Sequence, residues 1–196
     1  ICLTWLSTGS AVRSFVTVWR HLNENPMRKV LITGLMGSGK SELSRILRSR
    51  AYSVYDADSR TKALYGRKEL AERIHSELGL EISQLSQVFG DREKLAALEA
   101  IVHPLVLEDF LEFAAGSDSD PVFFESAIAM DKPLFKDVFD KVILVRASER
   151  KRYERNPQAE KRSAFQREPE HWDYLIENDA SLEDLERKLD LIIKDL

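Results

Sequence analysis

Short apolar runs alternate with longer segments of helical periodicity along most of the chain. The runs are rich in Val, Ile, Phe or Tyr and predict strands at 30–33, 53–55, 122–124, 142–145 and 174–176. The longer segments predict helices at 39–50, 57–76, 91–115, 148–168 and 181–195. This alternation favours an α/β fold with a mostly parallel sheet, and the continuous apolarity of "VLIT", "VFF" and "VILV" is typical of strands covered on both faces.

Capping residues and a proline refine the expected helix ends. Asp91 is a good N-cap for the helix 91–115, and Pro104 should break or kink that helix near His103. Ser181 and Asp184 form a capping-box-like start for the last helix. The polar segment "AGSDSDP", 115–121, is expected to be a linker into the third strand.

Composition narrows the function classes. The chain has 196 residues, 43% hydrophobic and 32% charged, which suits one domain with a small subdomain. A net charge of −4 argues against a general nucleic-acid or membrane-surface binder. The chain contains no run of eighteen apolar residues, so no membrane span is expected. Because Cys2 is the only cysteine, no internal disulfide is possible, and we expect a reducing, cytoplasmic setting.

Residues 1–26 differ in composition from the rest. Arg13 and Arg20 stand among Ser, Thr and apolar residues, a loose match to a transit peptide or a buried hairpin. However, "RKVLITG" after Met27 already makes a complete first strand. We therefore expect residues 1–26 to be an N-terminal extension that is not part of the native fold, and 27–196 to be the folded domain.

A phosphate-binding loop follows the first strand. "GLMGSGKS" fits the pattern G-x-x-x-x-G-K-[ST], and it lies between a predicted strand and a predicted helix. Glycines let several backbone N–H groups point at one phosphate, and the start of the helix adds its dipole. Lys40 would reach the β- and γ-phosphates of ATP, and the Ser41 hydroxyl would ligate Mg²⁺. The predicted nucleotide-binding residues are Gly34, Leu35, Met36, Gly37, Ser38, Gly39, Lys40 and Ser41.

Carboxylates follow two other strands and are expected near this loop. Ligands of open α/β sheets bind beyond the carboxyl ends of the strands. The second strand ends in "YDAD" and the third in "FFES", which places Asp56, Asp58 and Glu125 at that edge. A kinase benefits from a carboxylate that accepts the proton of the acceptor hydroxyl, and Asp56 is the first choice. Alternatively, either Asp caps the following helix, and Glu125 is an N-cap or a partner of the metal site.

Several motifs resemble the dephospho-CoA kinase family in the same order. They are "ITGLMGSGKS", "YDADSRTKALY", "DREKLAALEAIVHPLV", "FFESAIA", "FDKVILVRAS" and "YLIENDASLEDLE", and they extend from about Lys29 to Leu189. The resemblance implies transfer of the γ-phosphate of ATP to the ribose 3′-hydroxyl of dephospho-CoA, the last step of coenzyme A synthesis. It also implies a three-layer P-loop kinase fold, like that of nucleoside and nucleotide kinases, with a five-stranded parallel sheet, a helical substrate domain at 57–115 and a helical lid.

The resemblance also implies roles for single residues. Asp56 matches the aspartate that orients the acceptor hydroxyl, and His103 matches a His-Pro pair near the acceptor site. Asn178 matches a loop near the base of ATP. A hydrogen-bonded imidazole at a helix kink remains an alternative for His103, as an ordinary turn residue does for Asn178. One departure is "ESAIAM" after the third strand, where many members have a Pro-Leu-Leu-Phe-Glu run.

A basic segment follows the fourth strand, where such kinases carry the lid. Residues 146–167 hold eight Lys or Arg against three Glu. Lid arginines neutralise charge on the transferring phosphoryl group, and lid closure excludes water. Arg152 and Arg155 are the candidates for this role. The alternative is a solvated helix face, because glutamates are interspersed.

Two other functions remain open from sequence alone. One is a P-loop kinase for another small hydroxylated substrate, such as a nucleoside or a shikimate-like acid. The other is a degenerate paralogue that binds ATP for regulation without transferring phosphate. The expected partners are the small molecules ATP and dephospho-CoA, with no nucleic acid and no membrane, in a monomer or weak homo-oligomer.

Overall fold

The fold is built on one parallel sheet. A computed structural model of the chain describes residues 27–162 and 167–196. Its sheet has five strands in the order β2-β3-β1-β4-β5, and every neighbouring pair is parallel. The strands are β1 (Lys29–Thr33), β2 (Val54–Asp56), β3 (Val122–Glu125), β4 (Lys141–Arg146) and β5 (Tyr174–Glu177). The predicted α/β class and the five-stranded parallel sheet are confirmed.

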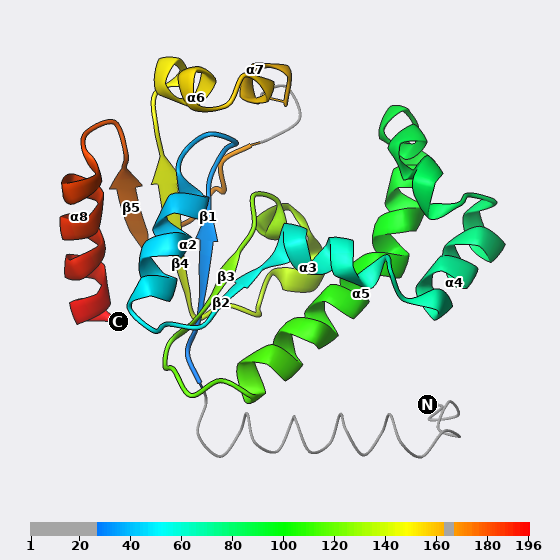
Figure 1. Cartoon of the computed structure of the whole chain (residues 1–196), viewed down its shortest axis with the longest axis horizontal. Coiled ribbons are helices and arrows are strands. Elements are labelled where there is room, and N and C mark those ends of the chain that lie inside the picture. Colours follow the sequence, from blue (N-terminus) through cyan, green and yellow to red (C-terminus); the bar gives the residue numbers. More distant parts are fainter. Residues whose placement is uncertain (1–26, 163–166) are drawn as a thin grey trace.

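Helices cover both faces of this sheet. In Figure 1, α2 and α8 lie on one side of the strands, α3 and α5 lie on the other, and α6 and α7 lie beyond one end of the sheet. Short 3-10 helices connect the other elements. The helices are α2 (Lys40–Ser49), α3 (Ala57–Leu64), α4 (Lys68–Leu78), α5 (Arg92–Ala115), α6 (Glu149–Arg155), α7 (Gln158–Arg162) and α8 (Leu182–Asp195), with η1 (Ile82–Gly90), η2 (Ala129–Asp131) and η3 (Pro133–Phe135).

Alternating side chains of the strands build one core on each face, because successive residues of a strand point to opposite sides. Phe124 packs with Tyr55 and Phe110 on the face of α3 and α5. Phe123, its neighbour in sequence, packs with the residues of α2 and α8, including Leu43. This two-sided burial is the reason why the strand sequences are apolar without alternation. No helix in the described part of the chain is long and apolar enough to cross a membrane.

Two predicted helices are wrong in extent. The segment 57–76 is two helices, because α3 ends at Leu64 and α4 begins only at Lys68. Gly66 lies in the gap, where its conformational freedom favours a turn over a continuing helix. The segment 148–168 is also divided, because α6 ends before Asn156 and Pro157. The helical conformation is unfavourable for Asn156, since the next residue is a proline. Residues 163–166 of that prediction lie outside the described residues.

The predicted helix caps agree with the structure. Asp91 accepts hydrogen bonds from two backbone N–H groups of α5, and Ser181 accepts one from Asp184 at the start of α8. Pro104 lies inside α5, which continues to Ala115 without interruption. The ribbon of α5 changes direction along its length (Figure 1). The predicted break is therefore wrong, and the kink is the correct alternative, because proline removes one backbone hydrogen bond and crowds the preceding turn.

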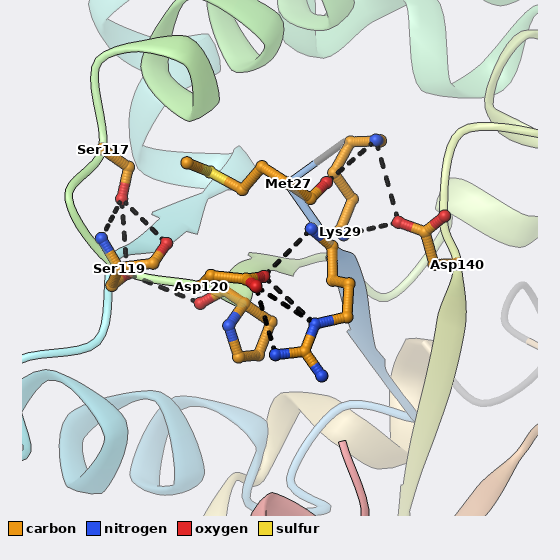
Figure 2. Close-up of polar contacts among 8 residues, drawn as sticks. Met27, Lys29, Ser117, Ser119, Asp120 and Asp140 are labelled. Carbon is orange, nitrogen blue, oxygen red and sulfur yellow. Dashed lines mark hydrogen bonds and ion pairs between the residues drawn. The ribbon is translucent and has the colours of Figure 1, made fainter. Parts of the chain in front are cut away.

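The amino end of β1 is tied to the segments that enter β3 and β4 (Figure 2). The guanidinium and backbone N–H of Arg28 donate to the carboxylate of Asp120, at distances of 3.1 to 3.3 Å. The backbone N–H of Lys29 donates to Asp140 Oδ2 at 2.7 Å. These contacts fix the amino ends of the central strands, opposite the carboxyl ends where the phosphate-binding loop begins. The expectation about residues 1–26 lies outside the described residues.

Candidate active site

The loop between β1 and α2 has the backbone of a phosphate cradle. Gly34, Gly37 and Gly39 all have positive φ, a conformation that L side chains rarely adopt. A Cβ added to Gly34 would lie 2.1 Å from the carbonyl oxygen of Val145. A Cβ added to Gly37 would lie 2.5 Å from the carbonyl oxygen of Arg152. Glycine is therefore required here both by backbone conformation and by the close packing of β4 and α6 against the loop.

The side chain of Lys40 contacts the first residues of this loop. Its ammonium donates to the carbonyl oxygens of Gly34 at 2.8 Å and Leu35 at 3.3 Å. Burial lowers the pKa of Lys40, while the carboxylates of Glu125 and Asp58 act in the opposite direction. A phosphate group would supply the full negative charge that the loop carbonyls do not, so the position suits the predicted contact with a nucleotide.

Ser41 and Glu125 meet at the start of α2. The Ser41 hydroxyl donates to Glu125 Oε1 at 2.8 Å, and Glu125 is buried at the carboxyl end of β3. The other oxygen, Oε2, is buried without a hydrogen-bond partner among the residues that the structure describes. A buried carboxylate oxygen without a donor is destabilising unless a cation or a water molecule meets it. Oxygen ligands are those that Mg²⁺ prefers, so Ser41 and Glu125 fit a metal-bound nucleotide here.

Helix α6 and the loop after β5 support the back of the cradle. Arg155 donates to the carbonyl oxygens of Ser38 at 3.3 Å and Asn178 at 2.8 Å. The buried amide of Asn178 also donates to the Ser38 carbonyl, at 2.9 Å. Asn178 thus lies directly behind the loop, and its predicted place near the ATP base stays a prediction.

Arg152 has an unusual environment for a cation. The residue is only 4% exposed, and its guanidinium carbon lies 5.4 Å from the centre of the Tyr153 ring. One guanidinium nitrogen, Nη1, is buried with no hydrogen-bond partner in the described part of the chain. Because Arg152 is buried, the expected alternative of a solvated helix face is wrong for this residue. A buried donor without a partner is destabilising until an anion or another acceptor reaches it.

Asp56 caps α3. Its Oδ1 accepts from the Ser59 backbone N–H at 3.0 Å, and its Oδ2 accepts from the Ser59 hydroxyl at 2.8 Å. Asp56 pairs in register with Glu125 on the neighbouring strand, so the two carboxylates follow adjacent strand ends. The structure thus contains the capping role, and the catalytic role of Asp56 stays a prediction.

A cavity of about 500 Å³ lies beside the cradle, between α3, α5 and the segment after β3. Met36 of the phosphate-binding loop and Gln158 of α7 contribute to its wall, so the cavity adjoins both the loop and the lid segment. Its apolar lining includes Leu98, Val102 and Phe135. The lining residues with charged or polar groups are Asp58, Thr61, Lys62, Tyr65, Glu99, His103, Ser126, Lys132 and Gln158. An apolar cavity with a few convergent polar groups is the usual form of a small-molecule site.

His103 lies on the α5 wall of this cavity. Its ring meets the Phe135 ring edge to face, with 6.0 Å between the centroids. Burial lowers the pKa of His103, Glu99 raises it and Lys132 lowers it. Glu99 and Lys132 form an ion pair of 2.7 Å beside the imidazole. The predicted substrate residues Asp58 and His103 are therefore brought together at one cavity, while Glu125 faces Ser41 instead.

A buried carboxylate joins the two helical walls of the cavity. Asp109 of α5 accepts two hydrogen bonds of 2.7 Å from Arg60 of α3 and one of 2.8 Å from the Tyr55 hydroxyl. Arg67 approaches the same carboxylate at 3.4 Å. Burial acts to raise the pKa of Asp109, but the hydrogen bonds from Arg60 and Tyr55 outweigh it, so the pKa is lowered overall. These contacts hold α3 against α5 and so set the width of the cavity.

Sequence reasoning missed Lys62, Glu99 and Lys132, and helical spacing could have found two of them. Lys62 lies four residues after Asp58, and Glu99 lies four residues before His103, so each shares a helix face with a predicted site residue. Lys132 lies between η2 and η3, in the segment that follows β3. No local pattern predicts its approach to Glu99, 33 residues away.

Comparisons with known proteins agree with this geometry. The family model described as dephospho-CoA kinase matches residues 28–194. A dephospho-CoA kinase of Helicobacter pylori is 31% identical over 194 residues, which are 85% of this chain and 96% of that protein. One of Thermus thermophilus is 33% identical over 186 residues, 84% of this chain and 90% of that protein.

Solved structures show the same similarity. A crystal structure of a Thermus thermophilus protein superposes with a TM-score of 0.73 at 30% identity, covering 87% of this chain and 98% of that one. The matched region includes the phosphate-binding loop, the cavity and the segment after β4. The chain therefore belongs to the dephospho-CoA kinase family, a family of phosphotransferases.

Proposed function

We propose that this protein transfers the γ-phosphoryl group of ATP to the ribose 3′-hydroxyl of dephospho-CoA, giving ADP and coenzyme A. The observation that carries the proposal is the shared wall between the two halves of the site. Met36 belongs to the phosphate-binding loop and also lines the neighbouring cavity. A donor bound on the loop and an acceptor bound in the cavity would thus meet directly, as in-line transfer requires.

The donor side fits ATP with its metal ion. Backbone N–H groups of residues 34–41 and the Lys40 ammonium would bind the phosphates. Ser41 and Glu125 would hold Mg²⁺, which supplies charge neutralisation on the β- and γ-phosphates when bound. The two buried groups without partners, Glu125 Oε2 and Arg152 Nη1, support this fit, because one favours a cation and the other an anion.

The acceptor side requires a base and a dry environment. The 3′-oxygen attacks the γ-phosphorus, the bond from that phosphorus to the bridging oxygen breaks, and ADP leaves with the bond's electron pair. Asp56 accepts the proton of the attacking hydroxyl. Asn at this position would keep the helix cap but not the base, so the two roles of Asp56 can be separated experimentally.

The helical segments divide the remaining work. Residues 57–115, which contain α3, α4 and α5, form the acceptor-binding subdomain, and the cavity lining from α3 and α5 supports this role. The lid is assigned to residues 146–167, of which 163–166 lie outside the described residues. The packing of Arg152 and Arg155 against the phosphate-binding loop supports this role. Lid closure would exclude water as a competing acceptor.

One assay tests the function. Purified protein with Mg-ATP should release ADP with dephospho-CoA much faster than without it, and the product should carry a 3′-phosphate. The acceptor panel should include a nucleoside and shikimate, which represent the rival kinase functions. ATP binding without transfer to any acceptor would instead favour the regulatory alternative.

The proposed setting is the cytoplasm, in a monomer or weak homo-oligomer. A single cysteine in 196 residues fits a reducing compartment, where the thiol stays free. Gel filtration with light scattering over a range of protein concentrations measures the oligomeric state.

A further inference from the structure

Lys132 is a cation that the proposed chemistry has not yet used. It lies between η2 and η3, after the carboxyl end of β3, and it lines the cavity together with His103. Its side chain is only 24% exposed, far less than that of an ordinary surface lysine. An ammonium group in such a position must have an ionic or hydrogen-bonding partner.

The partner in this structure is Glu99. Lys132 Nζ lies 2.7 Å from Glu99 Oε1, and the Glu99 side chain is 25% exposed. The neighbouring cavity wall is apolar, with Phe135 and Leu98 close in sequence to the pair. A half-buried ion pair holds its ammonium ready for another anion, because exchange of one carboxylate oxygen for a phosphate oxygen keeps the charge paired.

The acceptor brings such an anion. In dephospho-CoA a diphosphate is attached to the 5′-carbon of the ribose that carries the reacting 3′-hydroxyl. An acceptor held in the cavity therefore carries two negative charges within one sugar ring of the phosphate-binding loop. Among the described residues that line the cavity, the lysines are Lys132 and Lys62, and Lys62 is exposed with no ion-pair partner in the described chain.

We propose that Lys132 is a specificity-determining residue that binds the diphosphate of the acceptor and exchanges the Glu99 carboxylate for a phosphate oxygen. This inference rests on the proposed function, because it takes dephospho-CoA as the acceptor. It adds the reason why the site would prefer a nucleotide-like acceptor to a neutral nucleoside. Glu99 is then the partner of the ammonium in the free protein, and it competes with the phosphate for that ammonium.

A purely structural ion pair makes a different prediction. If the pair only stabilises the fold, removal of either partner should have an effect of the same sign on acceptor binding. If Lys132 binds phosphate, its removal weakens binding, while removal of the Glu99 charge frees the ammonium and does not weaken binding. The two single variants therefore discriminate between the two roles by sign.

The experiment compares Lys132→Met, Lys132→Arg and Glu99→Gln with the unaltered protein. The dissociation constant of dephospho-CoA is measured by calorimetry with a non-hydrolysable ATP analogue present, and KM and kcat are measured alongside. Lys132→Met should weaken dephospho-CoA binding about tenfold or more, since a charge-assisted hydrogen bond is lost. Lys132→Arg should recover most of this loss. Glu99→Gln should leave binding equal or tighter, and the KM for ATP should stay unchanged throughout.

Salt gives a second readout that a structural role would not move. Loss of a phosphate contact should flatten the dependence of dephospho-CoA binding on NaCl concentration in Lys132→Met. The proposal is overturned if Lys132→Met binds dephospho-CoA normally, or if Glu99→Gln weakens binding as much as Lys132→Met does. Calorimetry does not depend on turnover, so loss of the proposed function would appear separately, as binding of dephospho-CoA without transfer.

Discussion

The donor and acceptor halves of the site are built in different ways. The donor half is one contiguous loop, residues 34–41, whose backbone conformation is fixed by glycines and by packing against β4 and α6. The acceptor half is a cavity assembled from α3, α5, the segment after β3 and single residues of the loop and α7. The first offers backbone groups to a ligand, and the second offers side chains from distant parts of the sequence.

This difference has a physical consequence for substitutions. A change in the donor half acts on one tight phosphate contact and should affect transfer with any acceptor. A change in the acceptor half alters cavity shape or charge, and should affect mainly the affinity for one acceptor. The following experiments test this division, from the largest expected effect to the smallest.

Lys40→Met should produce the largest loss. The ammonium proposed to bind the β- and γ-phosphates is removed, so turnover should fall by about 10³-fold or more. Binding of dephospho-CoA, measured by calorimetry, should change little. Equal loss of acceptor binding would show that the two halves are not separate, and a melting curve checks that the buried side chain can be replaced without unfolding.

Asp56→Asn should lower turnover by about 10²-fold, because the amide cannot accept the proton of the acceptor hydroxyl. ATP affinity should remain near normal, and asparagine should preserve the cap of α3. Asp58→Asn is a comparison within the site: Asp58 is a predicted substrate residue that lines the cavity, so its loss should act on the KM for dephospho-CoA more than on turnover. Near-normal turnover of Asp56→Asn would leave Asp56 as a helix cap alone.

Arg152→Lys should lower turnover by about tenfold, because the planar guanidinium is better suited than ammonium to bridge phosphate oxygens. Arg150→Lys is the control, because Arg150 is an exposed residue of the same helix and pairs with Glu154 at 3.1 Å. Steady-state rates for both variants give the measurement. Equal rates for the two would contradict a phosphate contact by Arg152.

Asp109→Asn should act on the acceptor half alone. Asp109 of α5 loses the charge that pairs with Arg60 of α3. The KM for dephospho-CoA should therefore rise several-fold, while the KM for ATP stays constant. Because Arg60 is partly exposed, the loss in unfolding free energy should be only about 1–2 kcal/mol. Chemical denaturation measures this value, and a change in both KM values would contradict the division.

The free energy of unfolding should depend weakly on pH through His103, a residue of the acceptor half. Since the pKa of folded His103 is lowered, the unfolded chain binds its proton more readily. The resulting stability is complete above the unfolded pKa, about 6.5, and is lost as pH falls toward the folded value. His103→Gln should flatten the decline in unfolding free energy below that pH. An unaltered slope would show that the imidazole is protonated equally in both states.

The sequence predicted the donor half more completely than the acceptor half, because the residues of the donor half are consecutive in the chain. All strands were correct within a residue or two at each end, because their apolar runs are buried on both faces. The donor loop was readable because its chemistry lies in eight successive residues. Motifs singled out Asp56, Asp58 and His103; Asp58 and His103 line the cavity, and the catalytic role of Asp56 stays a prediction. Lys132 was missed because its position depends on the path of the chain after β3, which no local period encodes.

The errors in the helices have the same origin. Gly66 and Pro157 divide segments that have helical periodicity on both sides, so the hydrophobic pattern alone overestimates helix length. The burial of Arg152 could not be predicted either, since the interspersed glutamates of 146–167 are typical of a solvated helix. It results from the close approach of α6 to Gly37, a tertiary contact.

The order of the strands gives the site its span. β1 and β2 are consecutive in sequence, but β3 lies between them and pairs with both. The ends of β1 and β2 are thus separated by two interstrand spacings, about 10 Å. β3 acts as a spacer between the strand that leads to the donor loop and the strand that leads to Asp56, with Glu125 at its end. Segments attached to β2 and β3 can therefore diverge to fit new acceptors while the donor loop remains the same.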